Sequence, residues 1–308
     1  MSDASSPTGR QSAIYDLGYQ HYDGPRLGRR YAVRSLMTLS LRNTFGLGRG
    51  ASAKLIAATL VTFAMVPALI QVALAALVPI EDFEYVRPEE YYGFVQVVIV
   101  LFVASMASEL VGNDRKNNTM PLYFSRPIER SDYVLAKVAA LTIGLQALTL
   151  VPLLLLFLGN WLGAADASAW FADNVRDLPA SVVSAVLVSA QFAAIGILIA
   201  TFATKRALAL VAVLGTMLLS MIATGILAEL LPEGAAAVVM LVSPIYVARA
   251  TALVLFGAMP LERPLDLANG PSDQIAAVGL PGAVWIAACL AHIAIAVWLS
   301  IKRYRDTI

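Results

Sequence analysis

The sequence predicts an all-α integral membrane protein with six transmembrane helices. Of its 308 residues, 59% are hydrophobic and only 14% are charged, and the mean hydropathy is +0.73. These values lie far outside those of soluble domains. The apolar residues also gather into runs of about 20 residues, the length a helix needs to cross the hydrocarbon core of a bilayer. A third observation, the distribution of basic residues, sets the orientation.

Six apolar runs are expected to span the membrane: residues 55–80, 92–111, 134–158, 182–203, 207–228 and 283–301. A further run, 235–258, has Pro244 near its middle and Arg249 two thirds of the way along. Both residues are unfavourable in a lipid-facing spanning helix. We therefore interpret residues 235–258 as a re-entrant hairpin on the outer side.

Basic residues accumulate in the cytoplasmic segments of membrane proteins. With six spans and a cytoplasmic N-terminus, 18 of the 22 Lys and Arg residues fall on the cytoplasmic side. If 235–258 spanned as a seventh helix, the basic tail "KRYRDTI" would lie outside. The distribution therefore favours six spans with both termini cytoplasmic.

The N-terminal region divides into a cytoplasmic segment, 1–29, and an amphipathic helix, 30–53, ahead of the membrane domain, 54–308. The helix places Val33 and Leu36 on one face and Arg34 and Arg42 on another. This pattern is typical of a helix that lies at the inner interface and contacts membrane lipids. An ordinary cytosolic helix is the alternative.

The residues that a membrane enzyme would need are sparse. Only two histidines occur, His21 and His292, and they belong to distant parts of the expected topology. The single cysteine, Cys289, lies in the last span, and residues 46–54 lack the spacing of a phosphate-binding loop. We expect no catalytic residue, metal site or cofactor on this chain, and no nucleic-acid partner.

Three glutamines are among the polar residues near the middle of the expected spans. Gln96, Gln146 and Gln191 lie near the middle of spans, and Glu109 lies near an inner end. Such residues usually join helices by hydrogen bonds, and a role along a transport pathway is the alternative. An ion-coupled carrier normally has ionisable residues near the middle of the membrane. Any energy for transport is therefore expected from a partner.

The loop after the second expected span, "NNTMPLYFSRPIERSDYVLAK", predicts a short, stiff helix. Thr119 can cap it and Pro121 fits its first turn. Leu122, Tyr123 and Phe124 then offer apolar anchors, Pro127 ends the helix, and Ser131 can cap the next one. Clustered apolar residues on such a loop favour a contact surface, and a solvated connector is the alternative.

The longer stretch "ASELVGNDRKNNTMPLYFSRPIERSDYVLAK" resembles the first cytoplasmic loop of ATP-binding-cassette (ABC) permeases of the type 2 exporter class. The resemblance rests on the Asp114–Arg115 charge cluster, the Asn118–Thr119 step, the helix from Met120 to Phe124, the Ser125-Arg126-Pro127 turn, and Lys137. Asn118 stands where the family usually has glycine. The six-span plan and the element "SPIYVARA" at 243–250 also agree.

The resemblance implies a permease subunit that exports a substrate with ATP hydrolysed by separate cytosolic ATPase subunits, where ATP and Mg would bind. It also implies a second permease copy or a related permease, and a location in the bacterial cytoplasmic membrane. Residues implied to couple to the ATPase are Arg115, Thr119, Met120, Pro121, Leu122, Tyr123, Phe124, Arg126 and Pro127. Pro244, Tyr246 and Arg249 would belong to an outer gate. A non-transporting scaffold or assembly factor, or an ATP-independent carrier, are the alternatives.

Overall fold

The computed structural model confirms the all-α membrane fold class. It describes residues 24, 27–48, 50–77, 86–117, 119–125, 127–259, 275 and 278–307. Within these residues, six helical segments are long and apolar enough to cross a membrane. They are α2 (Ala51–Leu77), α3 (Tyr91–Lys116), α5 (Arg130–Leu145) continued by α6 (Leu150–Gly163), α8 (Asp177–Phe202), α9 (Arg206–Leu230) and α13 (Gly282–Thr307).

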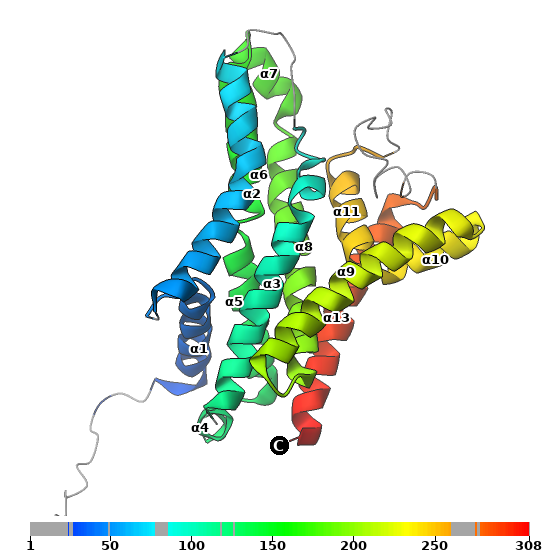
Figure 1. Cartoon of the computed structure of the whole chain (residues 1–308). Helices are drawn as coiled ribbons and strands as arrows, with labels where there is room; N and C mark the ends of the chain where they lie inside the picture. Colours follow the sequence, from blue (N-terminus) through cyan, green and yellow to red (C-terminus); the bar gives the residue numbers. More distant parts are fainter. Residues whose placement is uncertain are drawn as a thin grey trace, which may run out of the picture.

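Helices α3 and α8 form the centre of the bundle, and their apolar windows are the two most buried of the six spans (Figure 1). They approach closely at Gly196, where an added Cβ would lie 2.3 Å from a methyl carbon of Val103. By contrast, α9 leaves the bundle at an angle and exposes large apolar side chains such as Leu219 and Ile226 (Figure 1). The centre is therefore tightly packed, and α9 presents an apolar surface outward.

The third span is broken, which the sequence prediction of a continuous helix over 134–158 missed. Helix α5 ends at Leu145, and α6 begins at Leu150 after a turn. Pro152 has no N–H to donate to the Leu148 carbonyl four residues earlier. The hydroxyl of Tyr91 donates to that carbonyl instead, and it also lies 3.1 Å from the carbonyl of Ala64. A side chain from α3 thus satisfies the backbone group that the proline leaves open.

The N-terminal helix α1 (Gly28–Thr44) packs along the length of α5 (Figure 1). Arg29 at its start bonds Asp132. Thr44 at its end lies against Gly144, where an added Cβ would be 2.6 Å from the Thr44 methyl carbon. The apolar face of α1 packs against the protein and its basic face is exposed, since Leu36 is buried and Arg34 is exposed. The position of α1 relative to the bilayer stays a prediction.

The run interpreted as re-entrant forms two helices, α10 (Glu233–Val242) and α11 (Pro244–Leu255), bent by 99° at Ser243. The extended backbone of Ser243 and the ring of Pro244 place the break where the proline predicted one. Helix α11 packs on α8 and α13, whereas α10 follows α9 away from the bundle (Figure 1). Re-entry from the outer side stays a prediction.

Helix α7 (Ala167–Asn174) lies at the far end of the bundle from α4 (Met120–Phe124) and was absent from the prediction (Figure 1). Asp166 caps it by accepting from the backbone N–H groups of Ser168 and Ala169, each at 3.0 Å. The Ser168 hydroxyl and these N–H groups hold the pKa of Asp166 below its usual value. The cap explains why a helix of only eight residues forms here.

Candidate functional site

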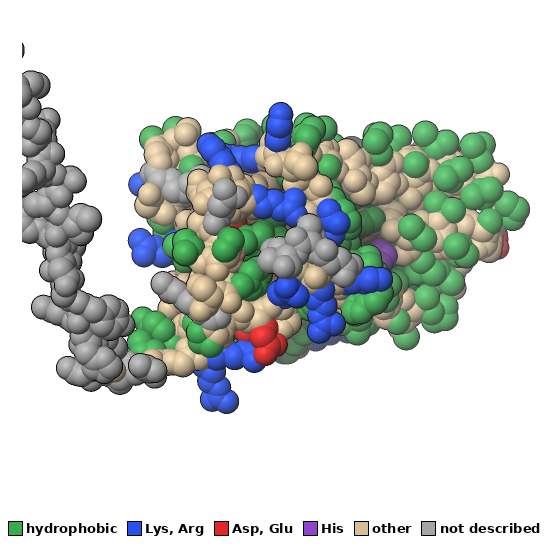
Figure 2. Space-filling model, turned by 90° about the horizontal axis from the view of Figure 1, so that it is seen from below, with side chains coloured by type: hydrophobic (Ala, Val, Ile, Leu, Met, Phe, Trp, Pro, Cys, Tyr) green, Lys and Arg blue, Asp and Glu red, His purple; other side chains and the backbone are tan. Residues whose placement is uncertain are grey.

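Helix α4 lies at the end of the bundle shared by the start of α5 and the end of α13, which we call the basic end. Lysine and arginine side chains gather there around few acidic ones (Figure 2). Thr119 makes no side-chain cap for α4; its hydroxyl donates to the Asp114 carbonyl at 3.2 Å. For α5, Glu129 and Asp132 form a capping box, so Ser131 is not the cap. Thr119 thus occupies the predicted N-cap position of α4 without the side-chain hydrogen bond of a cap, whereas the prediction of Ser131 as a cap was wrong.

The side chains of α4 divide between an outward and an inward face. Leu122 is 67% exposed, whereas Met120 is buried. The rings of Tyr123 and Phe124 turn inward and lie 6.0 and 6.1 Å from the ring of Tyr133, measured between centroids. Pro121 and Pro127 are exposed; Asn118 and Arg126 lie outside the described residues. Leu122 is thus the outward apolar anchor, and the two rings connect α4 to α5.

A buried ion pair lies beneath α4. Lys137 Nζ is 2.7 Å from Asp114 Oδ2 and donates to the Leu110 carbonyl at 3.1 Å. The Tyr133 hydroxyl donates to the same carboxylate oxygen at 2.7 Å. The Tyr133 ring also packs edge-on against Tyr304, with centroids 5.3 Å apart. Helices α3, α5 and α13 are joined by this group, which sequence spacing alone did not indicate.

Three more contacts tie the helix ends together at the basic end. Arg115 donates to the carbonyls of Thr201 and Ala203, where the last turn of α8 leaves carbonyls without helical partners. Glu109 pairs with Arg206 between α3 and α9. Arg29 binds Asp132 at 2.8 Å and also binds Glu129. Glu109 thus lies in an ion pair, and Arg115 braces α8 from beside α4.

At the opposite end of α3, Arg249 extends from α11 toward the first turn of α3. This side chain is 5% exposed, and its Nη1 donates to the carbonyls of Glu89 and Glu90 at 3.1 and 2.9 Å. Partial burial, and then repulsion from Glu89, raises the pKa of the neighbouring Glu90 carboxyl. Tyr246 and Pro244, the other residues assigned to a gate, are also buried on α11. We call this region the Arg249 end.

Two of the three glutamines join helices. Gln191 Nε2 lies 3.1 Å from the Pro244 carbonyl and 2.9 Å from His292 Nδ1, which links α8 to α11 and α13. The Cys289 thiol lies 3.3 Å from the amide oxygen of Gln191, Oε1. Gln146 bonds the carbonyls of Thr142 and Ala185. For Gln146 and Gln191, these contacts favour a role in joining helices over a role along a transport pathway.

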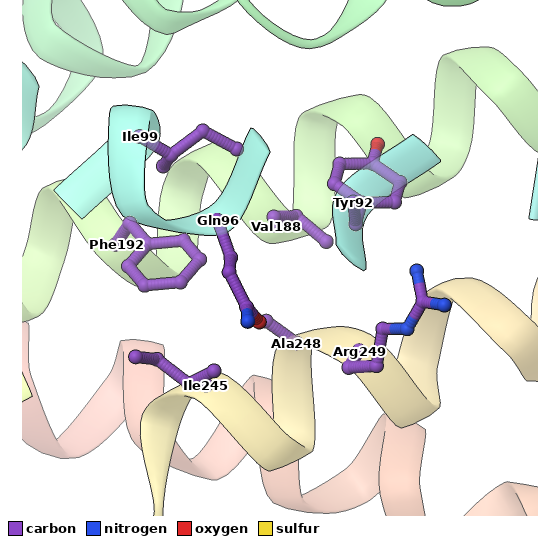
Figure 3. Close-up of a pocket in the computed structure, with 8 residues that line it drawn as sticks. All are labelled: Tyr92, Gln96, Ile99, Val188, Phe192, Ile245, Ala248 and Arg249. Atoms are coloured by element: carbon purple, nitrogen blue, oxygen red, sulfur yellow. The ribbon is translucent and has the colours of Figure 1, made fainter. Parts of the chain in front are cut away.

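Gln96 differs, because its amide points into a small cavity between α3, α8 and α11 (Figure 3). The cavity measures about 10 Å³, which is room for about one water molecule. It is lined by Tyr92, Gln96, Ile99, Val188, Phe192, Ile245, Ala248 and Arg249. The closed packing at this point leaves no space for a larger molecule.

These observations define a class: a polytopic membrane protein whose polar and aromatic contacts converge beneath one short helix. A family model described as "ABC-2 family transporter protein" matches residues 12–306, almost the whole chain. The chain therefore belongs to the ABC-2 transporter family and is a membrane permease of an ABC transporter, a transport subunit that is not itself catalytic. No curated protein matches the chain.

Proposed function

We propose that this permease exports its substrate with energy from separate cytosolic ATPase subunits that dock on α4. The observation that carries this proposal is the division of α4, with Leu122 exposed outward and two rings packed inward on Tyr133. An exposed apolar side chain on a short helix is suited to a pocket on a partner. The ATPase subunits would bind ATP and Mg; no cofactor is proposed on this chain.

A push on α4 would pass to three helices at once. The rings of Tyr123 and Phe124 would move Tyr133 on α5, and Tyr133 contacts both Tyr304 on α13 and Asp114 on α3. Close-packed interiors transmit such displacements because they compress little. Met120, Pro121 and Pro127 would hold α4 in place, and Arg115 and Thr119 would brace the loop; the part proposed for Arg126 in the coupling rests on the sequence alone. The basic end would therefore move as a unit when the ATPase closes.

The orientation follows from the same assignment. We place the basic end and both termini in the cytoplasm of a bacterium, and the Arg249 end outside, with Pro244, Tyr246 and Arg249 in the outer gate. A second permease copy, or a related one, would cover the apolar face of α9. Anionic lipid headgroups would meet the exposed Arg34 and Arg42, because α1 carries four arginines and no acidic residue.

The docking proposal is tested by replacing the exposed leucine of α4. Leu122→Ala should weaken retention of the ATPase by about 2 kcal/mol, or roughly 30-fold in affinity. The matched control is Leu162→Ala, because Leu162 is 76% exposed on α6, away from α4. The tagged permease is purified from native membranes, and both the co-purified ABC ATPase and its ATP hydrolysis are measured.

Equal ATPase retention in both variants would overturn the role of α4. A wild-type permease that retains no ATPase would favour the ATP-independent carrier. Retention of a stable partner without ATP hydrolysis would favour the scaffold.

A further inference from the structure

Gly93, in the first turn of α3, lies directly against the guanidinium of Arg249. A Cβ added to Gly93 would be 3.0 Å from Nη2 and 3.1 Å from Cζ of Arg249. The backbone itself does not require glycine there, because Gly93 is helical and is not among the residues with positive φ. Glycine costs about 1 kcal/mol relative to alanine inside a helix. An alanine at this position would require the guanidinium of Arg249 to move by a few tenths of an ångström.

Hydrogen bonds compensate the burial of the Arg249 guanidinium beside Gly93. Its Nη1 bonds the two carbonyls of Glu89 and Glu90, and the side chain is almost fully removed from solvent. Burial of a charged group is unfavourable unless hydrogen bonds compensate it. These two hydrogen bonds require α11 to stay close to the start of α3.

The cavity that contains the Gln96 amide lies on the inner side of this contact, and Arg249 forms part of its wall (Figure 3). With room for about one water molecule, the described conformation is closed at this end. Helix α11 meets α10 at a 99° bend at Ser243, which gives it a point about which to swing. Opening a wider passage between α3 and α11 requires Arg249 to leave Gly93.

We propose that Gly93 and Arg249 form a latch, in which Gly93 is the positioning residue that seats Arg249 and holds α11 closed over the cavity. The proposal rests on the transport function given above, and it adds Gly93 to the gate together with the step that must precede opening. Gly93 would act by leaving space for Arg249, without contacting the substrate.

The test replaces Gly93 by alanine in the full chain. Gly215→Ala is the matched control, because Gly215 is also inside a helix and a Cβ there would meet no atom within 4 Å. Gln96→Cys, in a Cys289→Ser background, reports opening through its rate of reaction with a membrane-impermeant maleimide added outside. With Gly93→Ala we expect about tenfold faster labelling, since each 1.4 kcal/mol lost by the closed state is a factor of ten. Gly215→Ala should leave the rate unchanged.

Arg249→Gln is the second variant, for use if Gly93→Ala is not recovered as a monodisperse protein. Unchanged labelling of Gln96→Cys in the recovered variants would overturn the latch. The labelling rates are compared without added ATP, where the ATPase does not drive opening, so this failure is distinguishable from failure of the proposed function. Faster labelling in the Gly93→Ala variant would support the latch. If the ATP hydrolysis of the co-purified ATPase were also the same with and without the permease, the coupling at α4 would be contradicted while the latch would stand.

Discussion

Both ends of the bundle bury a cation, but the partners differ. At the basic end, Lys137 pairs with the Asp114 carboxylate, which also accepts a hydrogen bond from Tyr133. At the Arg249 end, the arginine donates to the carbonyls of two consecutive residues and rests on Gly93. The group around Lys137 joins α3, α5 and α13, which suits the basic end to moving as a unit. The hydrogen bonds of Arg249 connect α11 with the start of α3, which makes the Arg249 end the place where these two helices would separate.

The largest effect is expected from breaking the ion pair. Lys137→Met should lower the free energy of unfolding by about 3–5 kcal/mol, because Asp114 would remain buried without its partner. SDS titration in mixed micelles measures this value. Arg249→Gln should cost less, because glutamine can still donate to a carbonyl.

The double variant Asp114→Asn with Lys137→Met serves as the control, because it removes both charges and should recover most of the loss. A double variant as unstable as Lys137→Met alone would show that the ion pair is not the source of the effect.

A smaller effect is expected at Tyr133. Tyr133→Phe keeps the ring that contacts Tyr304 but loses the hydrogen bond to Asp114, which should cost about 1.5–3 kcal/mol for a bond to a charged group. The same titration measures it, with Tyr31→Phe on the exposed face of α1 as control. If both variants unfold at the same SDS fraction, the hydroxyl of Tyr133 contributes nothing to the joint between α3 and α5.

The smallest effect is expected at Arg29, whose pairs with Asp132 and Glu129 are exposed to solvent. Arg29→Ala should destabilise the protein slightly at low salt, and the difference from wild type should shrink as salt screens the pairs. Thermal unfolding at low and high salt measures this dependence. A loss that is large and independent of salt would mean that Arg29 fixes α1 through packing.

The spans and the bend at Ser243 were predictable because they depend on local sequence, namely long apolar runs and the paired signal of Pro244 and Arg249. The break after Leu145 was not, because it depends on the distant Tyr91 hydroxyl that replaces the bond lost at Pro152. Pro152 alone is compatible with a continuous spanning helix.

The candidate site was predictable in position but not in detail. The loop sequence located α4 and its apolar residues, yet it did not show which would face outward. That choice depends on Tyr133 and Tyr304, which come from other helices. The hydroxyl of Thr119 bonds back to the Asp114 carbonyl instead of capping α4, and the cap of α5 is Glu129, which binds the distant Arg29. Gly93 gave no signal, because its role depends on a residue on α11.

The break between α5 and α6 also bears on bilayer thickness. The segment Arg130–Gly163 contains 34 residues, which as one straight helix would extend about 51 Å at 1.5 Å per residue. A typical hydrocarbon core is only about 30 Å thick, so such a rod would have to tilt steeply or project from the membrane. A turn at 146–149 interrupts this length between α5 and α6. We therefore expect this span to adjust to bilayers of different thickness at the turn, which lies between the packing of α1 on α5 and that of α2 on α6.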